Sequence, residues 1–333
     1  MSRDWTSDEI LNLGRSYQTA CVLAAAVDLD VFSTLATGDL SAAALAKQLA
    51  TDIRGTAILL DALTALELLE KNNNLYRLPP NLTNMLSATG TRREVLAMAQ
   101  HQANCMRSWA RLTTVVQSGQ PTARTASIRG AEADQAAFVE AMHCSSAPQA
   151  EELIAALQPL VFRHLLDVGG ATGTWTSAFL RAVPDATATL FDLPHVMPLA
   201  RRRLSAEDLI DRVTLVAGDF YSDPLPAGVD LVWLGAIVHQ NSRAQNRALF
   251  HKVHAALEPG GQVLIRDVLM DDTRTQPILG ALFAINMLVA TDGGGTFTFD
   301  ELRADLEAAG LTNATTVRRG EFMDSLVRAV RPE

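Results

Sequence analysis

The sequence predicts an α/β protein in which a helical domain precedes a mostly parallel, doubly wound sheet. From about residue 160 onward, short β-rich runs alternate with helical segments, a pattern typical of such a sheet. Residues 1–90 instead carry apolar side chains at helical spacing. With 333 residues, 48% of them hydrophobic, the chain is long enough for two domains with substantial cores.

Residues 1–90 have the pattern of short helices followed by a small β-wing. Apolar positions recur at helical spacing from Ile10 to Leu35, and Ser41 and Asp52 are expected to cap the next two helices. The run Leu75–Leu78 then alternates like a strand. These features predict an all-helical winged-helix domain with a wing at Tyr76, whose apolar helices favour a homodimer.

Residues 159–333 are expected to form a Rossmann-like domain with a mostly parallel, seven-stranded sheet. Residues 91–158 should form a helical connector between the two domains and supply part of a substrate pocket. The strands are expected at His164–Val168, Ala188–Phe191, Val213–Val216, Leu231–Leu234 and Val263–Ile265, with a C-terminal hairpin of Thr315–Val317 and Leu326–Val330.

A glycine turn follows the first of these strands, with Gly169, Gly170 and Gly173 in the run LLDVGGATGT. In an open α/β sheet such a turn faces the ligand site. The third and sixth positions of a dinucleotide fingerprint hold alanine and threonine here. Asp167, just before the turn, would repel a pyrophosphate but attract an ammonium or sulfonium group. An adenosyl-amino-acid cofactor therefore fits better than a dinucleotide, although such a turn can also be purely structural.

Acidic residues close the next two strands. Asp192, followed by Leu193, stands where a carboxylate can accept hydrogen bonds from both ribose hydroxyls. Asp219 can accept the adenine amino group, and the ring of Phe220 can stack on adenine. Each acid taken singly could instead be a helix cap or a solvent-exposed residue. Together, at successive strand ends, they make a consistent cofactor site.

His239 follows the strand Leu231–Leu234, beside the expected cofactor site. A hydroxyl that acts as a nucleophile must lose its proton, and histidine is the side chain whose pKa suits this task near neutral pH. A lone histidine can also be a structural hydrogen-bond partner. Its position at the functional edge of the sheet favours catalysis.

The order LDVGGATG, FDLP, GDFY and then His239 resembles the small-molecule O-methyltransferases, the group that includes caffeate- and acetylserotonin-type enzymes. The resemblance covers nearly the whole chain and implies a class I methyltransferase domain with S-adenosylmethionine as cofactor and S-adenosylhomocysteine as product. It also implies an N-terminal dimerisation domain. By resemblance, Gly169, Asp192, Asp219 and Phe220 fall on cofactor contacts, His239 on the general base and Asp267 on a carboxylate that orients it.

The sequence departs from the family pattern at four positions. His239 is followed by Gln240 and Asn241 where the family usually has Asp-Trp, Gly235 replaces a common lysine, and Thr296 replaces a glutamate. These departures leave the identity of the methyl acceptor open. By resemblance to the family, the acceptor is expected to be a small aromatic compound that carries a hydroxyl group. Candidate acceptor contacts come from helical segments, where ordinary core packing is the alternative: Trp109, Met142, His143, Phe283, Asn286 and Met287.

Two other functions remain open from the sequence. A family member can keep the cofactor and catalyse a different reaction such as hydroxylation. A winged-helix domain can also belong to a transcriptional regulator. Residues 1–90, however, contain six Lys and Arg against ten Asp and Glu, and the net charge of the chain is −9, which disfavours nucleic-acid binding.

The remaining composition indicates a cytoplasmic protein without a metal site or a membrane span. Cys21, Cys105 and Cys144 are far apart, odd in number and form no CxxC pair, which fits ordinary reduced thiols. The most apolar stretch, Ile278–Ala290, is too short to cross a bilayer.

Overall fold

The computed structural model describes residues 3–333, so the first two residues of the predicted 1–90 domain lie outside it. The chain divides into two compact units. The helical unit comprises the chain up to Arg107 together with Arg124–Cys144, and the sheet unit comprises Ser108–Ala123 and Ser145–Glu333. Each unit is described by itself below.

The helical unit contains six short helices, most of α7, the first part of α9 and a three-stranded wing. Its elements are α1 (Ser7–Arg15), α2 (Tyr17–Asp28), α3 (Val31–Leu35), β1 (Leu40–Ser41), α4 (Ala42–Leu49), α5 (Ile53–Ala65), β2 (Glu70–Asn72), β3 (Leu75–Arg77), α6 (Pro80–Leu86), α7 (Glu94–Trp109) and α9 (Ala131–Ala155). The wing has the order β1-β3-β2.

The predicted helix caps in this unit are confirmed. The hydroxyl of Ser41 accepts the backbone N–H of Ala44 at 3.2 Å, and the carboxylate of Asp52 accepts that of Gly55 at 2.7 Å. Both bonds satisfy an N–H that the first turn of a helix leaves without a partner. Tyr76 of the wing is buried in the apolar core of the unit.

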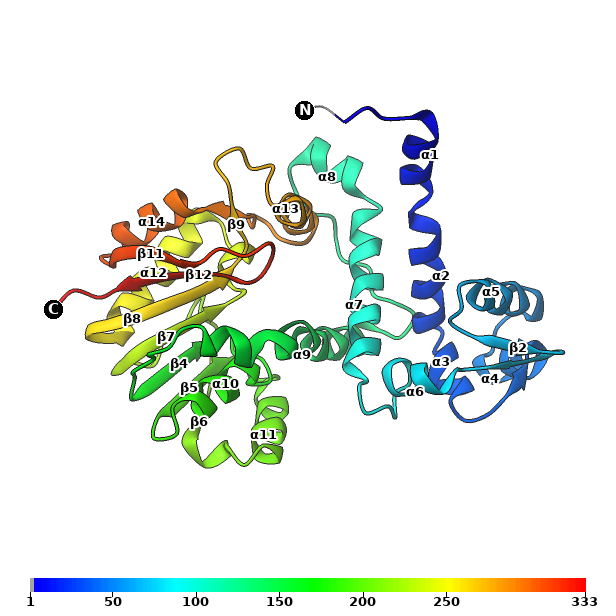
Figure 1. Ribbon diagram of the computed structural model, residues 1–333, viewed down its shortest axis with the longest axis horizontal. Helices are drawn as coiled ribbons and strands as arrows, with labels where there is room; N and C mark the ends of the chain where they lie inside the picture. Colours follow the sequence, from blue (N-terminus) through cyan, green and yellow to red (C-terminus); the bar gives the residue numbers. More distant parts are fainter. Residues whose placement is uncertain (1–2) are drawn as a thin grey trace. The chain divides into compact units, whose positions relative to one another are not determined.

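The sheet unit holds the seven-stranded sheet (Figure 1). Its elements are α8 (Leu112–Ser118), β4 (His164–Val168), α10 (Thr174–Ala182), β5 (Thr187–Asp192), α11 (Met197–Ala206), η1 (Ile210–Arg212), β6 (Val213–Ala217), β7 (Val229–Gly235), η2 (Val238–Gln240), α12 (Arg243–Ala256), β8 (Leu257–Asp267), β9 (Leu269–Met270), α13 (Ile278–Ala290), β10 (Phe297–Thr298), α14 (Phe299–Ala308), β11 (Thr312–Arg318) and β12 (Ser325–Val330).

The strand order is β11-β12-β8-β7-β4-β5-β6, and every neighbouring pair from β8 to β6 is parallel. β12 runs antiparallel to β8 and β11, which is the predicted C-terminal hairpin. One face of the sheet packs against α10, α11 and the end of α9, and the other against α12 and α14. The predicted fold class is confirmed. Because β4 lies between β5 and β7, the strand order reverses at β4, where open α/β sheets bind ligands.

Within residues 3–333, no helix has both the length and the apolar character that a membrane crossing demands.

Candidate active site

The glycine turn joins β4 to α10 at the strand-order reversal. The backbone N–H of Gly169 donates to the carbonyl of Phe191, 2.8 Å away, so the turn is fixed to the end of β5. Gly169 has a φ of +70°, and a Cβ there would lie 2.4 Å from the side chain of Ile237. A side chain here would be strained by the positive φ and would require the Ile237 side chain to move, so glycine is favoured at this position.

Asp167 lies beneath the turn and is fully buried. Its carboxylate accepts the hydroxyl of Thr176 at 2.6 Å, and a Cβ on Gly170 would come within 3.0 Å of it. Burial raises the pKa of Asp167 to about 7. The carboxyl group therefore supports the turn from below.

Asp192 connects the turn to β5. One carboxylate oxygen accepts the backbone N–H of Ala171 at 2.8 Å, and the other accepts that of Leu193 at 2.7 Å. Burial raises the pKa of Asp192. Each oxygen has a second lone pair that can accept a further hydrogen bond.

Asp219 and Phe220 lie in the loop after β6. Asp219 accepts the backbone N–H of Tyr221 at 2.9 Å, and its own N–H donates to Asp223 at 2.8 Å. The rings of Phe220 and Tyr221 are 4.6 Å apart. The ammonium group of Lys252 donates to three carbonyl oxygens of this loop, which holds the loop against α12.

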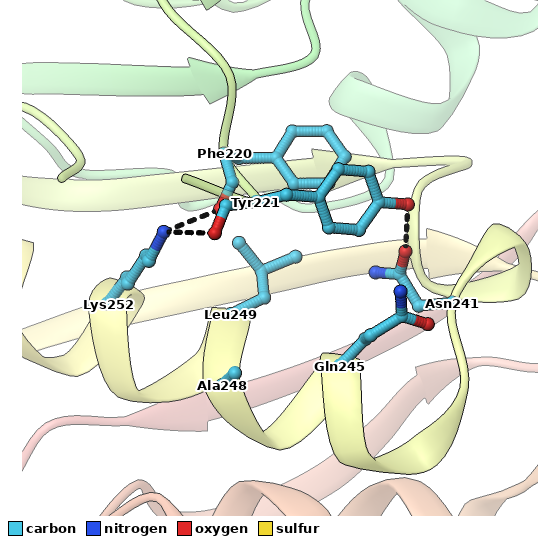
Figure 2. Close-up of a pocket in the computed structure, with 7 residues that line it drawn as sticks. All are labelled: Phe220, Tyr221, Asn241, Gln245, Ala248, Leu249 and Lys252. Atoms are coloured by element: carbon cyan, nitrogen blue, oxygen red, sulfur yellow. Dashed lines mark hydrogen bonds between the residues drawn. The ribbon is translucent and has the colours of Figure 1, made fainter. Parts of the chain in front are cut away.

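Figure 2 shows a small pocket of about 90 Å³ between this loop and α12. The hydroxyl of Tyr221 donates to the side-chain oxygen of Asn241 at 2.6 Å. Asn241, which is fully buried, donates to Asn246, and Asn246 donates to the carbonyl of Val238, both at 3.0 Å. This chain of hydrogen bonds connects the Asp219 loop to η2, the single turn that carries His239.

His239 and Asp267 meet at the carboxyl ends of β7 and β8. The Nδ1 atom of His239 lies 2.9 and 3.0 Å from the two carboxylate oxygens of Asp267, which also accept the backbone N–H groups of His239 and Val268. The ring of Phe283 stands edge-on to the imidazole, with centroids 4.8 Å apart. A carboxylate at Nδ1 keeps the proton there and leaves the Nε2 lone pair free.

The other candidate acceptor contacts divide between the two units. In the sheet unit, the indole N–H of Trp109 donates to the side chain of Asn286 at 2.9 Å, and Met287 is buried. Met142 and His143 belong to the helical unit and stay predictions. Thr296, at the position of the family's glutamate, is also buried.

Three features of the site were not predicted from the sequence. The hydrogen bonds from Tyr221 to Asn246 have no sequence signal except the unusual Asn241. Phe322 packs on Phe283 with ring centroids 5.5 Å apart, but it follows 39 residues later in an irregular loop. Arg266 does have a sequence signal, because it is a charged residue inside an apolar strand.

The residues around the turn fit an adenosyl-amino-acid cofactor. The buried hydroxyl of Thr172, in the turn itself, has no hydrogen-bond partner among the described residues, so a polar group remains for a ligand. Asp192 and Asp219 supply acceptors at successive strand ends. The fold and this site together define a Rossmann-like methyltransferase.

Similarity to known proteins gives the family. The chain matches the O-methyltransferase domain over residues 109–312 and the O-methyltransferase dimerisation domain over residues 12–86. The 3-hydroxy-5-methyl-1-naphthoate 3-O-methyltransferase of Streptomyces sahachiroi is 34% identical over 310 residues, which are 89% of this chain and 87% of that protein. The human acetylserotonin O-methyltransferase is 27% identical over 93% of this chain and 94% of its own length.

A solved structure, PigF with S-adenosylhomocysteine, superposes with a TM-score of 0.84 at 25% identity and covers 99% of this chain and 100% of that one. The chain belongs to the O-methyltransferase family. It is an S-adenosylmethionine-dependent enzyme that methylates small molecules on oxygen, and it carries the family's dimerisation domain. The predicted family, cofactor and enzyme class are thereby confirmed.

Proposed function

We propose that this enzyme methylates a hydroxyl group of a small aromatic metabolite, with His239 as the general base. The observation that carries the proposal is the bond between the Nδ1 atom of His239 and the buried carboxylate of Asp267. It leaves Nε2 as the proton acceptor, next to the glycine turn and the ends of the cofactor-binding strands.

The residues of the chain act on the acceptor proton. Bound S-adenosylmethionine supplies an electrophilic methyl carbon on its sulfonium. His239 takes the hydroxyl proton at Nε2 as the acceptor oxygen attacks, and Asp267 stabilises the imidazolium that results. The apolar ring of Phe283 beside the imidazole excludes water from this face.

The cofactor is held by the predicted contacts. Asp192 accepts hydrogen bonds from the ribose hydroxyls, and Asp219 accepts one from the adenine amino group. Phe220 stacks on the adenine. Gly169, Gly170 and Gly173 of the turn contact the amino-acid end, Leu193 contacts the cofactor after β5, and Asp167, buried beneath the turn, supports it from below. Their support is the hydrogen bonding that joins the turn, β5 and the Asp219 loop into one rigid edge.

The acceptor is a flat aromatic compound. Phe283 provides an aromatic ring next to His239, Phe322 packs against Phe283, and Asn286 with Trp109 provides a polar contact on α13. Met287, which is buried on the same helix, completes the proposed contacts of the sheet unit. The Streptomyces sahachiroi relative is named for a hydroxynaphthoate, a flat compound of this kind.

Labelled methyl transfer tests the proposal. We expect the purified enzyme to move the methyl of labelled S-adenosylmethionine onto naphthols and related phenols, and heat-denatured enzyme to move none. Label that stays in the cofactor while the aromatic compound is hydroxylated would instead support the alternative reaction. Failure to bind S-adenosylhomocysteine would contradict both.

We further propose a homodimer in the cytoplasm. The apolar side chains of Ile10, Leu11, Leu13 and Tyr17 on α1 and α2 are all more than half exposed, which a second copy would cover. Light scattering should give a dimer, and Leu13→Asp should shift it toward the monomer. A stable monomer of the unchanged chain would contradict the homodimer. The cytoplasmic location rests on the three free cysteines.

A further inference from the structure

Arg266, near the end of β8, carries a buried charge that has no hydrogen-bond or ion-pair partner among the described residues. The residue is 1% exposed, and neither its Nε nor its Nη2 atom has a hydrogen-bond partner within the described chain. Burial lowers the pKa of its guanidinium to about 10, so the group remains charged at neutral pH. Burying a charge without an ion-pair partner destabilises the folded protein. A buried charge of this kind indicates that a bound ligand supplies the missing anion.

The nearest carboxylates are already engaged. Asp267 binds the imidazole of His239, and Asp324 accepts the guanidinium of Arg318 and the backbone N–H of Phe322. Between residues 3 and 333, no carboxylate oxygen lies within 4.0 Å of a nitrogen of Arg266. The unused N–H groups of the guanidinium are therefore left for a group from outside the described chain.

The guanidinium stacks on a side chain from the first turn of α10, the helix that follows the glycine turn. Its central carbon is 4.7 Å from the ring centroid of Trp175, the second residue of that helix. Trp175 packs on Trp233 with centroids 4.9 Å apart. This stacking fixes the plane of the guanidinium and keeps its edges available.

A second unused donor lies on the neighbouring strand. The indole N–H of Trp233 is buried and has no partner in the described residues. Gly235 pairs in register with Arg266, and a Cβ on Gly235 would lie 2.4 Å from the indole nitrogen of Trp233. The absence of a side chain at 235 keeps the space over this nitrogen open. A guanidinium, an indole N–H and the N-terminus of α10 together are complementary to a carboxylate.

We infer that Arg266, with Trp233 beside it, anchors a carboxylate of a bound reactant. The inference rests on the proposed function and adds a residue to its site. Two sources have this chemistry: the amino-acid carboxylate of the cofactor, and a carboxylate on the acceptor, such as that of a hydroxynaphthoate.

Calorimetry on Arg266→Met separates these sources, because methionine keeps the length of the side chain and removes the charge. S-adenosylhomocysteine is compared with methylthioadenosine, which has the nucleoside and the sulfur but no amino-acid portion. A hydroxynaphthoate is compared with the naphthol that lacks its carboxylate. Arg303→Met, on the exposed surface of α14, is the matched control and should leave all four affinities unchanged.

If Arg266 binds the cofactor carboxylate, Arg266→Met lowers the affinity for S-adenosylhomocysteine by roughly tenfold to a hundredfold and leaves the affinity for methylthioadenosine unchanged. If the acceptor carboxylate is bound, the same loss falls on the hydroxynaphthoate and spares the naphthol. Equal loss for both members of each pair, or no loss in either, overturns the inference. Wild-type enzyme that binds neither nucleoside contradicts the proposed function itself.

Thermal melting of the ligand-free protein gives an independent readout. Arg266→Met should melt at the same temperature as the wild type or higher, because the variant removes an unpaired buried charge. S-adenosylhomocysteine or hydroxynaphthoate, whichever carries the carboxylate, should then raise the melting temperature of the variant less than that of the wild type. A ligand-free variant that melts lower would mean that Arg266 serves the fold, and would overturn the inference.

Discussion

The Nδ1 atom of His239 lies 2.9 Å from one carboxylate oxygen of Asp267, and the backbone N–H of His239 donates to the other at 3.2 Å. Asp267 is the last residue of β8, and His239 lies on η2, the short turn that follows the adjacent strand β7, so the pairing of these two strands brings the residues together. Asp267 is nearly inaccessible to solvent, with a 3% exposed side chain, while that of His239 is 12% exposed. The imidazole is thus held at one nitrogen and open at the other.

Asp267→Asn should lower kcat by roughly a hundredfold or more, because an amide no longer stabilises the imidazolium or fixes its tautomer. The affinity for S-adenosylhomocysteine should stay within about twofold, since Asp267 does not contact the cofactor in this account. Steady-state kinetics with calorimetry gives both values. Asp300→Asn, on the exposed surface of α14, is the control. An unchanged kcat in Asp267→Asn would remove Asp267 from the mechanism.

Asp192→Ala should weaken S-adenosylhomocysteine and methylthioadenosine alike, by roughly tenfold or more, because both ligands carry the ribose. The substitution also removes the hydrogen-bond acceptor of the backbone N–H groups of Ala171 and Leu193. Asp192→Asn, which keeps an oxygen acceptor, should lose less. Calorimetry that finds wild-type affinity in Asp192→Ala would exclude Asp192 from the cofactor site.

Asp167 should make the stability of the ligand-free protein depend on pH. Its pKa is about 7 in the folded protein, against about 3.9 in an unfolded chain. Between these values the folded state binds more protons, so this contribution to stability is present at low pH and is lost as the pH rises through 7.

Asp167→Asn removes that titration while an oxygen remains for Thr176. Compared with the wild type, the variant should gain stability from pH 5 to pH 8, by an amount on the order of a few kcal/mol. Denaturant unfolding at both pH values measures the difference. Wild-type and variant curves that stay parallel over this range would show that Asp167 keeps an ordinary pKa.

Tyr221→Phe should lower kcat several-fold, because the hydrogen bond of Tyr221 helps to position the turn that carries His239. The variant loses the bond to Asn241 and with it the connection to the Val238 carbonyl, at a cost in stability of about 1 kcal/mol. The KM for the acceptor should change little. A loss of stability without any loss of kcat would reduce Tyr221 to a structural role.

The sheet was predictable because its strands are apolar runs bounded by turns. β4 was predicted with its observed limits, His164–Val168. β8 was predicted only at Val263–Ile265, whereas it extends over Leu257–Asp267. Its first half contains Pro259, Gly260 and Gly261, which disfavour a strand locally. Leu257 pairs with Val229 of β7, and Gly260 and Gly261 exchange backbone hydrogen bonds with Arg331, just after β12, so long-range contacts override that preference.

The candidate site was predictable where strand ends bring residues together. Asp192 and His239 could be placed because parallel strands end at one edge. Contacts made by loops and helices were not accessible in the same way. Tyr221 and Asn241 are twenty positions apart, and their hydrogen bond depends on how the loop after β6 folds onto α12. Nothing local in either segment encodes that approach.

The rate of methyl transfer by His239→Ala, measured against pH, is the decisive test of His239 as the general base. A phenol with a pKa of about 10 ionises by itself at high pH. The variant should therefore be slower than the wild type by roughly a hundredfold or more near neutral pH. Its rate should then rise about tenfold per pH unit toward the wild-type rate, with unchanged affinity for S-adenosylhomocysteine. A variant that matches the wild-type rate at neutral pH would contradict the assignment of His239 as the base.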